Sequence, residues 1–361
     1  MPDAQTSRWS TRQLLPPTLV FLAALLATVA IASPLFLAPQ LARVSLDTSL
    51  VAISTSTEPI ATLDRCSLDR PRAAMLAPGK LIRSQRVVAV RPADRHIATL
   101  QAGTVIRRDD NATGCADPVQ LAVVDRVTVR RTTAAPTGES SIQTDSNRPA
   151  VVLPQRDGVT YLFAPGFNPD GQRFFDPITR RTVDLNKLGR DTVAGRSVTK
   201  LRADIPDTDL AALPDADPRT RIVKPGSWFG WPGASVEAHA FQGGSYTLSV
   251  DEQSGLIIDA QIVVHRDYRA GDRRLSSFAA TFRYDAKTRE SLADAARSQA
   301  RPGWLAGRII PLLAALGALV AAAGAWALRR SAGDQPLPLD EARSLQGSGW
   351  VGSLDEVRET R

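Results

Sequence analysis

Histidine is the side chain most often used as a general base, and the chain has three, His96, His239 and His265. They lie on separate stretches that read as strands, where an isolated histidine is more often structural than catalytic. The sequence lacks a Gly-x-Ser-x-Gly elbow, a Walker loop and a His-Glu-x-x-His motif. We therefore predict no catalytic residue and no enzymatic activity; a hydrolase with an unfamiliar site is a minor alternative.

One stretch has the oxygen-rich character of a calcium loop. The segment "DDNATGCADPVQ" (Asp109 to Gln120) places Asp, Asn, Thr and Gly at positions 1, 3, 5 and 6, but Gln120 stands at position 12, where a bidentate Glu is needed. A tight Gly/Asn turn explains the same residues. We predict no metal site and no cofactor.

The two cysteines, Cys66 and Cys115, both lie in the middle of the chain. An even pair in an oxidising compartment most simply forms one disulfide, here closing a loop of about 50 residues. The alternative is two buried free thiols. Without a Cys-x-x-Cys or a Cys/His cluster, zinc binding is not indicated.

Aromatic side chains are concentrated at two places. "GSWFGWPG" puts Trp228, Phe229 and Trp231 on a Gly/Pro loop, where they either contact a ligand or membrane interface or plug one end of a sheet. We favour the plug. "YLFAPGFNPDGQRFFDPITRR" (Tyr161 to Arg181) is predicted to contribute core aromatics, with Tyr161–Phe163 and Phe174–Phe175 pairing as strands across an Asn-Pro-Asp-Gly turn.

The candidate residues lie between two long apolar stretches of the chain. No charged residue occurs from Gln13 to Ala42, nor from Ile309 to Leu328. A helix of about 20 residues spans about 30 Å, the thickness of a bilayer core. For the first stretch a cleaved signal peptide ending at Ala32 is the alternative, but its apolar length favours an uncleaved anchor. For the second, a buried core helix is the alternative.

The predicted organisation follows from these spans. We expect a cytoplasmic N-terminus (1–12), a transmembrane signal-anchor helix (13–42), an extracytoplasmic β-rich domain (43–303), a second transmembrane helix (304–328) and a disordered cytoplasmic polar tail (329–361). Arg8 and Arg12 precede the first span and only Arg43 closely follows it, so the positive-inside rule places both termini in the cytoplasm.

Several residues are predicted to lie at the membrane interface, where indole rings and arginines collect: Trp304, Arg308, Trp326, Arg329 and Arg330. The net charge of +7 belongs to the segment between the spans. A basic outer domain is suited to the lipid bilayer surface, an envelope lipid or an acidic wall polymer. Its basic residues are dispersed, so nucleic acid is not an expected partner.

Short alternating runs separated by polar turns predict β-structure between the spans. The expected strands are Val44–Ile53, Lys80–Val90, His96–Arg107, Leu121–Thr132, Val159–Phe163, Gln172–Phe175, Ser197–Ala203, Ser235–Phe241, Ser245–Val250, Leu256–His265 and Leu275–Tyr284. Residues 132–150 and 204–219 are expected to be loops. The fold class is therefore a mainly β extracytoplasmic domain, with antiparallel sheets and hairpins, between two single transmembrane α-helices.

One local pattern recurs three times: an apolar run, then Asp, then Thr or Ser three residues later. It occurs at Asp176, Asp251 and Asp285. An Asp at this position starts a tight turn by hydrogen-bonding nearby backbone. The first two copies are predicted to form hairpins, and the third to lead into a helix from Arg289 to Gln299 capped by Thr288.

The order of these features resembles a family of actinobacterial cell-envelope proteins grouped under the porin PorA name. The resemblance is carried by "PQLARVSLDTS", "VVDRVTVRRTT", "YLFAPGFNPDGQRFFDPITRR", "SVDEQSGLIID" and "YDAKTRESLADAARSQ". It implies a two-span protein with an extracytoplasmic domain, and the family's name implies a channel.

Three functions fit this reading. The first is contribution to a pore or to envelope transport, with oligomerised helices as the simplest route, because the strands are short and interrupted for a membrane barrel. The second is an extracytoplasmic module that binds lipid or polymer. The third is a structural envelope protein without a ligand. An apolar cavity in the outer domain would favour the second.

Overall fold

The computed structural model describes residues 11–110 and 119–333. It divides the chain into two compact units. One is Phe36–Ala306, called the β-domain below, and the other combines Met1–Leu35 with Gly307–Arg361.

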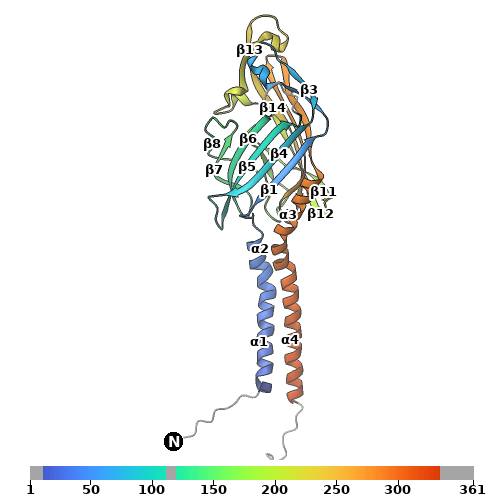
Figure 1. The fold of residues 1–361 in the computed structure, drawn as a ribbon. Helices are drawn as coiled ribbons and strands as arrows, with labels where there is room; N and C mark the ends of the chain where they lie inside the picture. The colour runs from blue at the N-terminus through green and yellow to red at the C-terminus, as the bar shows by residue number, and fades with distance from the viewer. Residues whose placement is uncertain (1–10, 111–118, 334–361) are drawn as a thin grey trace, which may run out of the picture. The chain divides into compact units, whose positions relative to one another are not determined.

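The β-domain is built on an antiparallel sheet of twelve strands (Figure 1). Eleven of them follow the order β11-β12-β14-β15-β16-β1-β4-β5-β6-β7-β8, and β13 pairs with β14 off this path. Their bounds are β1 (Ser49–Ser56), β4 (Leu81–Val90), β5 (Ile97–Arg108), β6 (Val119–Arg130), β7 (Pro136–Gln143), β8 (Val151–Leu153), β11 (Asn186–Val193), β12 (Arg196–Asp209), β13 (Arg221–Pro225), β14 (Ser235–Asp251), β15 (Ile257–Ala270) and β16 (Arg273–Tyr284).

Two small ribbons and several helical turns complete this unit. The ribbons pair β2 (Ile60–Leu63) with β3 (Met75–Gly79), and β9 (Arg173–Asp176) with β10 (Arg181–Asp184). The helices are α2 (Ala38–Leu41) and α3 (Ala286–Trp304), with 3-10 turns at Arg65–Asp69, Leu210–Ala212, Pro218–Thr220 and Gly226–Phe229.

Alternation with period two explains why these segments form half-buried strands. In β6, Leu121, Val123 and Val127 are buried, whereas Ala122 and Arg126 are exposed. The predicted fold class, mainly antiparallel β with two long apolar terminal helices, is confirmed.

The other unit contains α1 (Thr11–Ala32) and α4 (Ile310–Gly333), which pack side by side (Figure 1). Small residues of α4 face α1: Gly317 lies against Leu26, and Gly324 lies against Leu19. Such small residues let apolar helices approach closely. The candidate spans, Leu15–Leu41 and Ala286–Arg330, are long and apolar enough to cross a membrane by length and composition.

The Asp-initiated turns are present at all three predicted positions. Asp176 accepts hydrogen bonds from the backbone and hydroxyl of Thr179, Asp251 does the same with Ser254, and Asp285 accepts from the backbone of Thr288. The first two turns join β9 to β10 and β14 to β15. The third starts α3 with Asp285 as its N-cap, so the predicted Thr288 cap and later helix start are wrong. The Asp285 carboxylate caps the helix because it accepts a hydrogen bond from the free backbone N–H of Thr288 in the first turn.

Strand β14 was expected to be two strands and is one of 17 residues. The glycines between the expected strands continue the pairing with β15. At Gly244, φ is +151° and an added Cβ would lie 1.9 Å from the carbonyl oxygen of Val263. Glycine here permits a close approach between strands instead of ending one.

Two predicted loops contain strands instead. Strand β7 lies in the segment expected to be a loop at 132–150, and β12 extends to Asp209 in the segment expected to be a loop at 204–219. Strand β7 buries only Ser140 and Ile142, so its residues carry little apolar periodicity. Its backbone pairing with β6 decides its conformation.

The predicted pairing across the Asn-Pro-Asp-Gly turn is wrong. Phe174 bridges Val159, and Leu162 bridges Leu256 of the segment before β15, while β9 pairs with β10. The stretch therefore threads through the interior. Its core role is confirmed, because four of its rings are at least 93% buried: Tyr161, Phe163, Phe174 and Phe175.

Candidate functional site

The three histidines occupy separate places in the β-domain. His96 is exposed, His239 hydrogen-bonds both Asp209 and Glu237, and the ring of His265 lies 3.3 Å from Asp207. Within the described residues, no group of His, Cys, Asp and Glu is arranged to hold a metal ion.

The calcium-like loop and the cysteine pair fall partly on residues 111–118, which lie outside the described residues. Asp110 is bound by the guanidinium of Arg108 at 2.7 Å. Cys66 lies in the 3-10 turn Arg65–Asp69, and its predicted bridge to Cys115 stays a prediction.

The aromatic loop lies inside a core cluster. Trp228 and Phe229 are each 5% exposed, and they pack with Ala238, Ala240 and other apolar residues of that cluster. Trp231 is partly buried against the same cluster. This is the placement of a plug, and it leaves these rings little surface to offer a ligand.

The predicted interface residues, Trp304, Arg308, Trp326, Arg329 and Arg330, are all exposed. The Arg330 guanidinium lies 3.8 Å from the centre of the Trp326 ring. Exposed aromatic and cationic side chains at helix ends are typical of membrane-interface residues. The interface role of these five residues stays a prediction.

A buried polar network fixes the interior segment to the sheet. Arg156 Nη1 donates to both carboxylate oxygens of Asp125 at 2.8 Å, and the Tyr161 hydroxyl donates to Asp125 at 2.5 Å. The Arg156 guanidinium also lies 4.0 Å from the Phe175 ring centre. Burial, followed by the nearby Asp125 charge, raises the pKa of Tyr161 well above its ordinary value, so the phenol remains a donor.

An opening in the β-domain, called the outer cavity below, has a volume of about 420 Å³. This lies within the range of small-molecule sites, roughly 300–1,000 Å³. Its walls come from β6, β15, the β9–β10 turn and the two 3-10 turns after β12, and they include Arg65, Leu68, Val119, Leu121, Val123, Asp145, Ile178, Arg180, Leu210, Leu213, Ala216, Asp217, Arg219, Arg266 and Tyr268.

The charged side chains that line the outer cavity differ in their partners. Arg65 donates to the carbonyl of Val119 and Arg180 to that of Pro214, while Arg219 is bound to Asp217 at 2.7 Å. Burial raises and the bonds from Arg219 lower the pKa of Asp217, which falls to about 2, so this carboxylate is ionised.

Arg266 has no ion pair or side-chain hydrogen bond within the described residues. Burial lowers the pKa of its guanidinium, although an arginine stays charged near neutral pH. With four arginines against two aspartates, the outer cavity has a positive surface.

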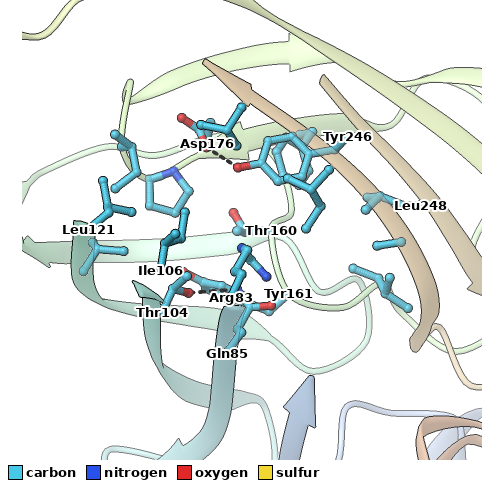
Figure 2. Close-up of a pocket in the computed structure, with 18 of the residues that line it drawn as sticks. Arg83, Gln85, Thr104, Ile106, Leu121, Thr160, Tyr161, Asp176, Tyr246 and Leu248 are labelled. Carbon is cyan, nitrogen blue, oxygen red and sulfur yellow. Dashed lines mark hydrogen bonds between the residues drawn. The ribbon is translucent and has the colours of Figure 1, made fainter. Parts of the chain in front are cut away.

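A second, smaller opening, the inner pocket, has a volume of about 50 Å³ and is shown in Figure 2. Its lining is mostly apolar: Ile106, Leu121, Val123, Phe174, Pro177, Ile178, Leu248, Ile257, Ala260, Ile262 and Val264, together with Arg83, Gln85, Thr104, Thr160, Tyr161, Asp176, Gln242, Tyr246 and Tyr284. Two hydrogen bonds close its polar side, Tyr246 to Asp176 and Gln85 to Thr104, both drawn in Figure 2.

Sequence reasoning missed Arg83 and Gln242, although a signal existed for the arginine. Arg83 shares strand parity with the buried Leu81 and Val87, so the pattern of "LIRSQRV" places it on the inward face. Nothing in the sequence distinguishes Gln242 or Arg266, because their meaning depends on neighbours from other strands.

Comparisons with known proteins agree with the layout. Residues 15–326 match the family described as Porin PorA. A Porin PorA of Corynebacterium amycolatum is 26% identical over 320 residues, covering 74% of this chain and 81% of the relative. A solved beta-barrel-like protein of unknown function from Brucella abortus is 11% identical and covers 67% of this chain, at a TM-score of 0.16 that carries no argument. The family match spans most of the sequence, and the chain therefore belongs to the Porin PorA family.

Proposed function

We propose that this is a membrane-anchored cell-envelope protein whose β-domain binds an anionic amphiphile of the envelope in the outer cavity. The observation that carries the proposal is a cavity of about 420 Å³ with apolar walls beside the unpaired Arg266. Apolar walls with a few placed polar groups are the usual composition of a ligand site. Arg266 is half-buried and forms no ion pair with a carboxylate among the described residues, which favours an anion as its partner.

The apolar part of such a ligand has a matching surface. Leu68 and Leu210 lie in 3-10 turns and Leu213 directly follows one. Leu121 and Val123 come from the inward face of β6. Removing apolar surface of both partners from water contributes about 25 cal/mol per Å² of buried surface. The arginines of the outer cavity then contact an anionic group of the ligand.

We further propose that α1 and α4 anchor the protein in the plasma membrane, with both termini in the cytoplasm and the β-domain outside. The arginines before the first span and the Trp/Arg residues flanking the second support this orientation. Protease accessibility of the β-domain in intact spheroplasts, with the termini protected, is the expected result. Cleavage at the termini instead would contradict the orientation.

Channel formation is the second candidate, supported by the name of the relative, Porin PorA. Exposed positions of the sheet carry charged residues such as Arg86, Arg107 and Arg126, which are unsuited to a lipid-facing barrel wall. A pore would therefore require several copies of α1 and α4, that is, a homo-oligomer. Conductance of the purified protein in planar bilayers, lost on deleting Ile309–Leu328, would support it; no conductance at all would remove it.

Native mass spectrometry of the full chain purified in nanodiscs tests ligand binding. We expect a retained anionic amphiphile, lost in Ala216→Trp, which fills the outer cavity from its wall. Ala212→Trp is the matched control, because Ala212 is exposed in the neighbouring 3-10 turn and does not line the cavity. Equal retention by both variants, or no retained molecule in the parent protein, would overturn the proposal.

A further inference from the structure

The inner pocket contains a buried cation, Arg83, that has no counterion in the part of the chain that the structure describes. Arg83 is 6% exposed, and its Nη1 has no hydrogen-bond partner within the described residues. The Oε1 atom of Gln242, which is 4% exposed, lines the same pocket and also lacks a partner there. Burying a charge or a polar atom without a partner is costly, so two such atoms at one cavity indicate a group that is bound there.

The buried carboxylates of the interior are engaged elsewhere. Asp125 is paired with Arg156 and Tyr161. Asp176 accepts from the Tyr246 hydroxyl at 2.8 Å and from Thr179, and no ion pair joins it to Arg83 in the described part of the chain. Figure 2 shows Asp176 hydrogen-bonded to Tyr246 on one side of the pocket and Arg83 beside Thr104 and Tyr161.

We propose that the inner pocket is a carboxylate-binding subsite, in which Arg83 holds a carboxylate of the ligand, while the arginines of the outer cavity contact a second anionic group of the same molecule. This inference rests on the proposed function and deepens it by naming the ligand class, an aliphatic molecule that carries a carboxylate in addition to its outer anionic group. Gln242 can rotate its amide to present either NH₂ or oxygen to the bound group. The guanidinium supplies charge-assisted hydrogen bonds, and the apolar walls surround the first carbons of the chain.

The small volume of the pocket favours a small, planar acid group. About 50 Å³ has room for a few water molecules, since each needs roughly 10–15 Å³ by this measure. A planar carboxylate of three heavy atoms fits such a space, whereas a tetrahedral phosphate needs more room on every side. The pocket is also too small for a long chain, which must continue elsewhere.

The outer cavity provides that continuation. Leu121, Val123 and Ile178 line both openings, so the two are separated by these side chains. Ile178 lies in the turn between β9 and β10 and packs against all three apolar clusters of the β-domain. A chain bound at Arg83 would pass Ile178 to enter the outer cavity.

Short probes test the subsite while leaving most of the outer cavity empty. With the full chain in nanodiscs, calorimetry is expected to show binding of hexanoate, and no binding of hexanol, hexylamine or hexyl phosphate. Arg83→Met should weaken hexanoate binding by about tenfold or more, because one charge-assisted contact is lost. Arg83→Lys should retain part of it. Arg86→Met is the matched control, an exposed arginine on the same strand, and should bind as the parent does.

Stability separates a ligand-binding arginine from a structural one. Without ligand, Arg83→Met should unfold at a higher temperature than the parent protein, because an unpaired buried charge is removed. A lower unfolding temperature would assign Arg83 to the fold and overturn the inference. If Arg83→Met does not fold, Arg83→Lys decides by its hexanoate affinity, and an affinity equal to that of the parent overturns the inference.

The two proposals fail separately. Hexanoate binding without any retained amphiphile would leave the subsite and remove the proposed function. A retained amphiphile that is held equally well by Arg83→Met would leave the proposed function and remove the subsite. If hexanoate does not bind the parent protein, the inner pocket holds ordered water only, and the inference is overturned.

Discussion

Two buried arginines of the β-domain face the same interior and differ in their partners. Arg156 has Asp125 at 2.8 Å and the Phe175 ring at 4.0 Å, while Arg83 has neither a carboxylate nor a ring partner within the described residues. The first arrangement offsets most of the desolvation of Arg156 locally, although its Nε has no hydrogen-bond partner among the described residues, and it fixes the interior segment to β6. The second leaves the desolvation of Arg83 without a counterion among the described residues, which is the interaction that the proposed carboxylate would supply.

The largest expected effect comes from breaking the compensated pair. Arg156→Met leaves Asp125 buried with only Tyr161 as a donor, and should lower the free energy of unfolding by about 3–5 kcal/mol. Thermal and denaturant unfolding of the purified protein measures this loss. Arg126→Met, an exposed neighbour of Asp125 on β6, is the control. Equal losses in the two variants would show that the pair does not hold the interior segment.

The opposite sign is expected at Arg83. Without ligand, Arg83→Met should raise the free energy of unfolding by an amount on the order of 1–4 kcal/mol, the range for replacing buried ion pairs by apolar side chains. The same unfolding measurements apply. A loss similar to that of Arg156→Met would erase the difference between the two arginines.

Breaking the Arg196–Asp251 ion pair, in which the aspartate is buried and the arginine is partly exposed, should lower the free energy of unfolding by an intermediate amount. Arg196 donates two hydrogen bonds to Asp251. Burial raises the pKa of Asp251, but the bonds from Arg196 and Ser254 outweigh it and hold that pKa below its ordinary value. Asp251→Asn should cost about 1–3 kcal/mol at neutral pH.

The pH dependence of stability in acid tests the sign of the Asp251 contribution. Because the folded pKa of Asp251 is lowered, its contribution is full above the unfolded pKa, near 4, and is lost as the pH falls through the folded value. The stability difference between parent and Asp251→Asn should therefore narrow in unfolding curves measured from pH 5 to pH 2. A constant difference would contradict the assignment.

The smallest effect is expected at His239. Hydrogen bonds to Asp209, and then to Glu237, raise the pKa of its ring. The resulting stabilisation is present below the unfolded pKa, near 6.5, and is lost as the pH rises through the higher folded value. His239→Gln should cost under about 1 kcal/mol at pH 6 and nothing at pH 9. Asp209→Asn should reduce the same pH dependence, and an unchanged profile would exclude this pair as its source.

Local rules predicted the parts of the fold that depend on neighbouring residues. The Asp-initiated turns at Asp176, Asp251 and Asp285 formed as expected, since their hydrogen bonds reach only three residues along the chain. The pairing of Phe174 with Val159 was not predicted, because both partners depend on how the interior segment lies against the sheet. Strand β7 was missed for the same reason, since its partner β6, rather than its composition, makes it a strand.

The sequence by itself determined the two apolar helices, the β-rich segment between them, the turn positions and the family. Each depends on periodicity, length or residues that are close in the chain. Only the tertiary structure decided that Arg156 has a counterion, that Arg83 has none among the described residues, and that Ile178 lines two openings. Desolvation and charge pairing depend on groups brought together from distant strands, so no local pattern encodes them.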